Sequence, residues 1–253
     1  MDYPDYSYPP GLFATVARDI LLLRHRSFRE DAKACIEKIN PPLRVLGKKN
    51  IPQHGPCIVT MNHYHRAGFG AQWLALAIAA SVPADMHWVM TGEFTYPGKW
   101  YELFGAMGSR ILLKRIAHVY GFTSMAPMPP RPKDVEVRAA AVRAVLEYVR
   151  HAKDPILGLA PEGYDTSDGK LVRPATGLGR FGLLLSRAGL KFIPVGVYEA
   201  DGVFHLHFGE AYELSIRRDV SADKRDDQAV QIIMKNIARL LPLQLRGEFV
   251  EET

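Results

Sequence analysis

Apolar positions along the chain follow two spacings, and each spacing predicts a different secondary structure. Short apolar runs bounded by glycine, proline or asparagine predict buried strands. Apolar residues that recur every three to four positions predict helices with one buried face. The predicted strands are Leu43–Leu46, Cys57–Met61, "MHWVMT", "PILGLA", "FIPVGVY" and "DGVFHLHFG", the last of which alternates like a hairpin partner. The predicted helices span about residues 11–39, 69–82, 98–117, 134–151, 177–189 and 223–241.

This alternation of strands and helices predicts the fold class. Strands that alternate with helices are typical of a layered α/β fold, with a mostly central sheet flanked by helices. A proline-rich link, "MAPMPPRPKD", interrupts the pattern, but the alternation continues on both sides of it. We therefore expect the link to be a loop within a single domain. Residues 1–42 form an N-terminal helical region in this interpretation, and residues 43–253 form the main α/β domain.

The composition is typical of a folded globular chain, with 47% hydrophobic and 23% charged residues among 253. Two cysteines, Cys35 and Cys57, are too few for a disulfide framework, which favours a reducing compartment. The N-terminal "MDYPDYSYPPG" lacks the basic and then apolar order of a signal peptide. The longest apolar run, Leu74–Val82, is shorter than the roughly 18 residues that a membrane span needs. We therefore expect a cytoplasmic protein without a transmembrane segment.

The formal net charge of +5 is compatible with nucleic acid, an anionic membrane surface or acidic substrates. The basic residues are not interleaved with aromatic residues, and no nucleic-acid-binding motif is present, so we expect no nucleic-acid partner. One basic amphipathic stretch favours a membrane surface. Its apolar stripe is Leu12, Phe13, Val16, Ile20 and Leu23, and its basic residues are Arg18, Arg24, His25, Arg26 and Arg29. We expect peripheral contact with the inner face of the membrane, and the simpler alternative is that the stripe packs on the domain.

Two polar segments follow predicted buried strands, at the position where α/β sheets place ligand sites. The first is Asn62–Arg66, which contains two histidines, and an imidazole with a pKa near neutrality suits a general base. The second is Pro161-Glu162-Gly163, in which a carboxylate precedes a glycine that permits close backbone approach. Taken alone, the second segment is more often a turn than a site.

Taken together and in order, these segments resemble the motifs of the phospholipid and glycerol acyltransferases of the lysophosphatidic-acid-acyltransferase type. The first motif of that family is a strand followed by Asn-His-x4-Asp, and Val59–His63 matches it as far as the histidine. A later motif, Phe-Pro-Glu-Gly-Thr-Arg, is matched in part by Ala160–Asp165. An apolar strand with a proline, here Pro194, matches the fourth motif. The resemblance spans residues 43–247.

The resemblance implies transfer of a fatty acyl group from an acyl thioester, either acyl-CoA or an acyl-carrier protein, to a hydroxyl of a lipid or glycerolipid-like acceptor. It also implies that His63 is the general base and that no metal or prosthetic group is required. His65 and Glu162 are the further catalytic candidates. The substrate-binding candidates are Asn62, Arg66, Arg131, Gly163, Tyr164, Asp165 and Pro194.

The aspartate of the first motif is missing from this chain. Counted from His63 its position is Gly68, and counted from His65 it is Gly70. Three explanations follow. In the first, another group orients His63: Glu162, His65, a backbone carbonyl or water. In the second, His65 is itself the base. In the third, the chain is a catalytically inactive acyl- or lipid-binding relative.

Two further departures concern the acceptor. The arginine of the family's second motif is replaced by apolar residues, with Arg131 several positions later, and the Thr-Arg pair of the third motif is Tyr164-Asp165. A phosphate would be poorly paired beside such a loop, unless Arg66, Arg131 or Arg173 compensates. We therefore expect an acceptor other than a simple phosphomonoester, such as a neutral, glycosylated or amine-bearing lipid hydroxyl.

Overall fold

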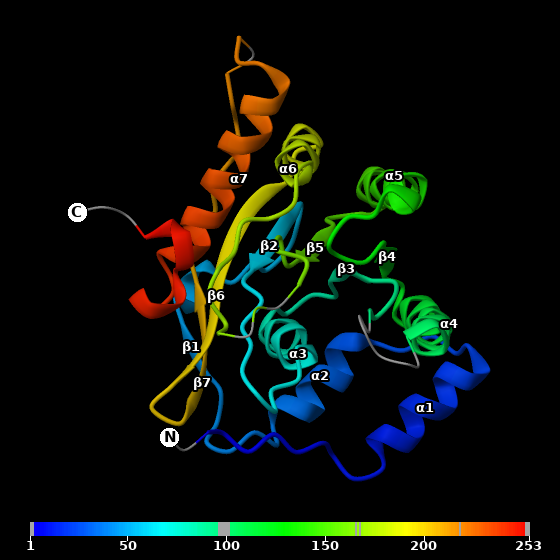
Figure 1. The fold of residues 1–253 in the computed structure, drawn as a ribbon. Helices are drawn as coiled ribbons and strands as arrows, with labels where there is room; N and C mark the ends of the chain where they lie inside the picture. The colour runs from blue at the N-terminus through cyan, green and yellow to red at the C-terminus, as the bar shows by residue number, and fades with distance from the viewer. Residues whose placement is uncertain (1–2, 96–101, 165, 167, 218, 251–253) are drawn as a thin grey trace.

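A seven-stranded sheet forms the centre of the molecule (Figure 1). The computed structural model describes residues 3–95, 102–164, 166, 168–217 and 219–250. The strand order is β1-β7-β6-β2-β5-β3-β4, and every neighbouring pair is parallel except the antiparallel β6 and β7. The strands are β1 (Arg44–Leu46), β2 (Cys57–Met61), β3 (His87–Thr91), β4 (Thr123–Met125), β5 (Ile156–Leu159), β6 (Lys191–Ala200) and β7 (Val203–Phe208).

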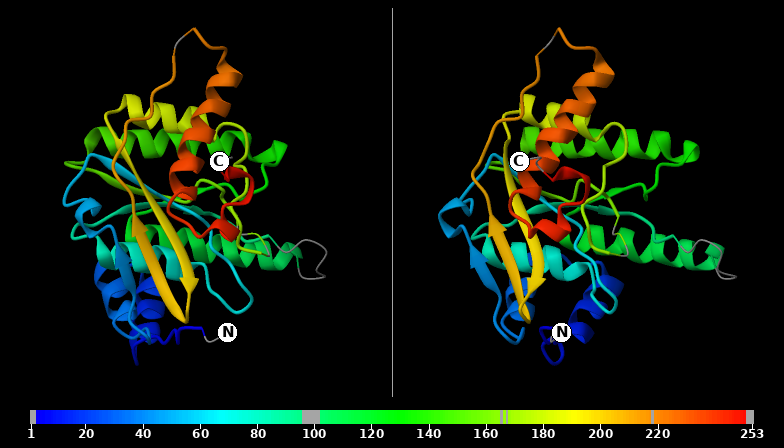
Figure 2. Two further views of the ribbon diagram at one scale, coloured as in Figure 1. Left: turned by 90° about the vertical axis from the view of Figure 1, so that its left-hand side faces the viewer. Right: turned by 60° about the vertical axis from the view of Figure 1, so that its left-hand side comes forward.

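Helices cover both faces of this sheet, which confirms the predicted α/β fold with a central sheet (Figures 1 and 2). Helices α2 and α3 lie against one face, and α5, α6 and α7 lie against the other. Helix α4 flanks the edge strand β4 and contacts α1. The helices are α1 (Leu12–Leu22), α2 (Phe28–Ile36), α3 (Gln72–Ser81), α4 (Glu102–Tyr120), α5 (Val135–His151), α6 (Leu178–Arg187) and α7 (Ala222–Ala238).

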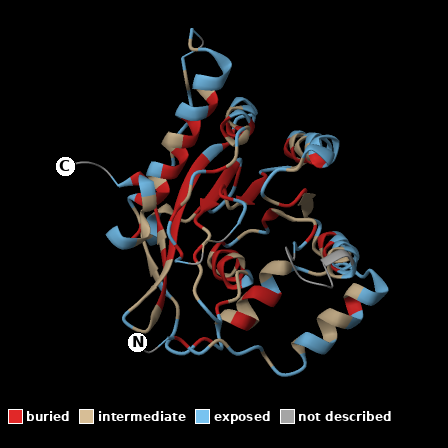
Figure 3. Cartoon of the chain, in the orientation of Figure 1, coloured by how far each residue is buried: buried red, intermediate tan, exposed pale blue. Residues whose placement is uncertain are grey.

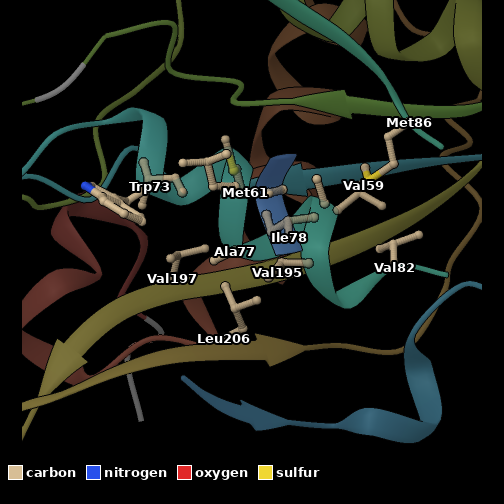
Figure 4. Packing of buried hydrophobic residues seen from close by; sticks show 14 of the residues in the cluster. Val59, Met61, Trp73, Ala77, Ile78, Val82, Met86, Val195, Val197 and Leu206 are labelled. Carbon is tan, nitrogen blue, oxygen red and sulfur yellow. The ribbon is translucent and has the colours of Figure 1, made fainter. Parts of the chain in front are cut away.

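The interior of the fold explains why the apolar runs become these elements. All five residues of β2 are buried, as expected for a strand that is covered on both faces. Helix α3 is apolar almost all round, so it is buried instead of presenting one face to solvent. Figure 4 shows its Ala77 and Ile78 packed among Val59, Met61 and Val195 of the sheet.

Most predicted elements are present close to their expected positions, including the hairpin of β6 and β7. The expected helix over 11–39 is two helices, because Leu23 takes a positive φ of 54° and Ser27 begins a new helix by accepting the Glu30 N–H. A strand before the proline-rich link was not expected, yet β4 pairs with β3. The first residues of the expected helix 98–117 lie outside the described residues.

Some basic residues of the N-terminal region form ion pairs within the protein. The Arg26 guanidinium lies 2.6 Å from Asp19 and 2.5 Å from Asp31, and the Tyr120 hydroxyl donates to Asp31 at 2.9 Å. These contacts join α1, α2 and α4. Figure 3 shows that the outer faces of α1 and α4 remain exposed. Within the described ranges, no helix has both the length and the apolar character to cross a membrane.

Candidate active site

The two polar segments lie side by side because the strands that precede them are parallel neighbours. Strand β2 pairs with β5 from Cys57 and Ile156 to Thr60 and Leu159. On the other side of β2, the buried Asn62 amide bonds the backbone of Val197, donating at 2.8 Å and accepting at 2.7 Å. Asn62 therefore fixes the end of β2 against β6, and its side chain faces the protein interior rather than a substrate.

Glu162 braces the two segments against each other. Its side chain is 1% exposed, and its carboxyl oxygens accept the backbone N–H groups of His63 at 2.6 Å and Val172 at 3.0 Å. Burial raises the pKa of Glu162 from 4.5 to about 7, although the two N–H donors favour the ionised form. These bonds hold the main chain of His63 in place, so Glu162 positions the histidine through its backbone.

A cavity of about 1290 Å³ lies beyond the ends of these strands, and its wall is mostly apolar. The half-buried His63 lines it, together with Gly163 and the neighbouring Pro161. His65 does not line this cavity; its backbone packs so closely against Gly169 that a Cβ there would lie 2.5 Å from the His65 oxygen. The geometry therefore favours His63 over His65 as the histidine that meets a substrate.

Arg66 is held by an ion pair on the far side of the loop. Its Nε lies 2.5 Å and its Nη2 2.9 Å from the Glu199 carboxylate, which also accepts the hydroxyls of Tyr6 and Tyr64. The Glu199 side chain is 3% exposed. This arrangement uses the Arg66 charge to anchor the loop that follows His63.

The remaining sequence candidates have varied surroundings. Arg131 lines the cavity, but its guanidinium pairs with Glu93 at 2.9 Å and also with Asp134. Pro194 lies within β6, opposite Thr60, and is a residue of the sheet. Tyr164 is 39% exposed. Asp165 lies outside the described residues.

Gly68, the position of the missing aspartate, has a positive φ of 79°. A residue with a side chain is strained in this region of backbone conformation, whereas glycine enters it without cost. A Cβ at Gly68 would meet only the Arg66 Nη1 atom, at 3.8 Å. The backbone rather than crowding therefore selects glycine at this position.

Two arginines in the cavity wall were missed by sequence reasoning. Arg138 and Arg143 lie on α5, and Arg138 donates to the Pro127 carbonyl at 3.2 Å. Neither has a carboxylate partner among the described residues. Their positions beside the apolar stripe of a predicted helix were visible in the sequence, but nothing indicated that this stripe faces a cavity as well as the core.

The apolar cavity wall around His63 indicates which chemistry the site can support. The apolar wall suits hydrocarbon, and a neutral imidazole on that wall suits removal of a proton from a hydroxyl. In the part of the chain that the structure describes, no group of histidine, cysteine, aspartate and glutamate side chains is placed to hold a metal ion.

Comparisons with known proteins agree with the order of motifs along the chain. The model of a family described as "Acyltransferase" matches residues 42–198. Among solved structures, the chain is similar to the 1-acyl-sn-glycerophosphate (LPA) acyltransferase PlsC from Thermotoga maritima. The TM-score is 0.53 with 14% sequence identity, over 90% of this chain and 88% of the other. No curated protein matches the sequence.

Proposed function

The chain belongs to the acyltransferase family, and on this premise we propose that it transfers an acyl group from a thioester to a hydroxyl of a lipid acceptor, with His63 as the general base. One observation carries the assignment of the base. Among the described residues that line the cavity, His63 has the only side chain that ordinarily titrates near neutral pH.

In the proposed reaction, the neutral His63 imidazole removes the proton of the acceptor hydroxyl as its oxygen attacks the thioester carbonyl. The tetrahedral intermediate collapses, the carbon–sulfur bond breaks, and the thiolate leaves with the proton that the imidazolium returns. The products are an ester and a free thiol. Glu162 supports this step by holding the His63 main chain at the cavity wall.

The acceptor proposed here is not a simple phosphomonoester. The three arginines that could compensate for the altered motifs are each paired with carboxylates: Arg66 with Glu199, Arg131 with Glu93 and Asp134, and Arg173 with Asp227 and Glu248. An arginine that is already paired offers less to a phosphate, because its carboxylate partner must first be displaced. Arg138 and Arg143 also line the cavity without a described carboxylate partner, but they lie on α5 and not in the altered motifs. The pairing of the three arginines nearest those motifs supports a neutral, glycosylated or amine-bearing lipid hydroxyl as the acceptor.

We also propose peripheral contact with an anionic membrane, which the exposed apolar residues of α1 and α4 support. In the predicted stripe, Phe13 is 80% and Leu23 45% exposed, whereas Leu12 packs partly against the core. Part of the predicted amphipathic stripe therefore packs on the fold and part remains on the surface. Exposed apolar side chains beside basic residues are typical of interfacial helices.

A lipid-acceptor assay with labelled acyl-CoA tests the proposed function. We expect transfer to a neutral lipid hydroxyl to exceed transfer to lysophosphatidic acid. Because general base catalysis contributes about a hundred-fold or more, His63→Ala should lower kcat by at least that factor.

His65→Ala is the matched control and should keep most of the activity. Loss of transfer in His65→Ala but not in His63→Ala would assign the base to His65 instead. If the unaltered protein binds acyl-CoA but transfers no acyl group to any acceptor, the chain is the catalytically inactive relative. Transfer to lysophosphatidic acid as fast as to neutral acceptors would overturn the proposed acceptor class.

A further inference from the structure

The cavity beside His63 extends over both faces of the sheet. Side chains alternate between faces along a strand, and in β3 Trp88 packs with the core under α2 and α3 whereas Val89 packs with the core under α5, α6 and α7. Both residues line the same cavity. Its volume of about 1290 Å³ exceeds the roughly 300–1,000 Å³ of a typical small-molecule site. The space therefore suits more than one ligand segment.

The wall divides into two apolar arms. The first, which we name the α3–α4 arm, includes Phe28, Ala75, Trp88, Leu113, Ile116 and Phe122. The second, the α5–α6 arm, includes Val89, Val142, Leu146, Leu159, Leu178 and Phe181. His63 and Gly163 follow the ends of the central strands β2 and β5, so they lie between the two arms.

The rims of the two arms differ in chemistry. Beside the α3–α4 arm, the cavity-lining Phe94 and Leu112 are each 46% exposed, and Ile111 of α4 is 56% exposed. These side chains carry the apolar wall of the arm out to the surface. The α5–α6 arm also has exposed apolar side chains at its rim, Val135 at 64% and Leu184 at 40%. It is bordered in addition by Arg138 and Arg143, whose charges no described carboxylate neutralises.

This difference identifies which substrate each arm takes. We propose that the α3–α4 arm receives the hydrocarbon chain of the acceptor lipid from a membrane, and that the α5–α6 arm receives the acyl chain of the donor. CoA and the carrier-protein prosthetic group both carry phosphate, which Arg138 and Arg143 are suited to bind. The two chains then approach His63 from opposite faces of the sheet. This inference rests on the proposed function, because it names where the two substrates of that reaction lie.

Matched substitutions that fill one arm at a time test the assignment. Ala75→Phe places a ring in the α3–α4 arm, and Ala139→Phe places the same ring beside Arg138 on α5. Because a change in apolar pocket size alters discrimination by about ten-fold or more, Ala75→Phe should raise KM for a long-chain acceptor by about that factor. The KM for acyl-CoA should remain within about two-fold. Ala139→Phe should do the reverse and shift the preferred donor towards shorter acyl chains.

Circular dichroism of each variant verifies folding, and Ile116→Phe on α4 replaces Ala75→Phe if the latter fails to fold. If both substitutions change only the donor KM, both arms serve the donor and the assignment is wrong. The assignment is equally wrong if neither substitution changes either KM.

A binding experiment separates this inference from the proposed reaction. Pyrene-labelled acyl-CoA is bound to His63→Ala, which prevents turnover, and a long-chain lipid acceptor is then titrated. Two arms predict that both ligands bind together, so pyrene fluorescence should persist at saturating acceptor. Displacement of the probe would mean that the two chains compete for one space, and the two-arm inference would fail. Absence of transfer by the unaltered protein, with both ligands bound together, would instead overturn the proposed function alone.

Discussion

At the scale of single residues, Glu162 shows how a motif carboxylate can act without facing a substrate. Both of its oxygens accept backbone N–H groups, one from His63 and one from Val172. Because burial raises its pKa to about 7, the group is partly protonated at neutral pH. The free energy that Glu162 contributes by accepting the N–H groups of His63 and Val172 should therefore depend on pH.

Replacing Glu162 by glutamine tests this dependence. A carboxyl with a raised pKa stabilises the fold fully below its unfolded pKa, and this contribution is lost as the pH rises through its folded pKa. The rise from 4.5 to about 7 corresponds to about 3 kcal/mol. Glutamine does not ionise, but it offers one acceptor oxygen to two N–H donors, at a cost of about 1–3 kcal/mol.

We therefore expect Glu162→Gln to be less stable than the unaltered protein near pH 5, with a deficit that shrinks or reverses towards pH 8. Urea unfolding of both proteins across this range measures the difference in the free energy of unfolding. A deficit that is the same at all pH values would show that the pKa of Glu162 is not raised.

At the scale of elements, α4 presents an apolar stripe to solvent. Phe104, Met107 and Ile111 are 69%, 57% and 56% exposed, and their spacing places them on one face of the helix. The side chain of Lys114 is exposed one turn further along. The helix combines an apolar stripe with positive charge, as helices in a membrane interface do.

Ile111→Glu tests whether this stripe contacts lipid. Burial of an isoleucine side chain contributes about 1.5–3 kcal/mol, so its loss should weaken binding to anionic vesicles by about ten-fold or more. Co-sedimentation with vesicles measures the change. Leu243→Glu is the control, because Leu243 is 63% exposed and belongs to the C-terminal segment after α7. Figure 1 draws this segment, in red, well away from α4. Equal losses in both variants would argue that general charge, not this helix, governs binding.

At the scale of the whole molecule, Glu199 joins three segments that are far apart in the sequence. It accepts hydrogen bonds from Tyr6 near the N-terminus and from Tyr64 and Arg66 after β2, while it lies itself in β6. The Arg66 guanidinium also lies 3.8 Å from the centre of the Tyr3 ring. The N-terminal segment therefore packs against the loop that contains His63.

A double-mutant cycle measures the coupling across this ion pair. Removing one partner of a buried pair leaves the other charge without compensation, so Glu199→Gln and Arg66→Met should each lower the free energy of unfolding by about 3–5 kcal/mol. The double variant should lose less than the sum of the two, because neither charge remains. Urea unfolding of the four proteins gives the coupling energy. Strictly additive losses would show that the pair does not hold the loop.

Several features of the fold and the site could be predicted from sequence. The apolar run of β2 and the polar Asn62 and His63 after it placed a candidate base at a strand end, and the structure has that boundary at Met61. The hairpin of β6 and β7 was visible as alternation. These features depend only on residues that are close together in the sequence, because the spacing of apolar residues shows which face of an element is buried. The break at Leu23 was missed, because its positive φ is unusual for leucine.

What the sequence by itself determined is therefore the order of most elements, though not β4, together with the family and the place of His63 after a buried strand. Only the tertiary structure decided that Arg66 pairs with Glu199, that Glu162 bonds the His63 backbone, and that Arg138 faces the cavity. The physical reason is that a hydrophobic pattern shows that one face of an element is buried, but it does not show which other element packs against that face. Ion-pair partners and cavities depend on which elements become neighbours, and here those neighbours come from widely separated parts of the chain.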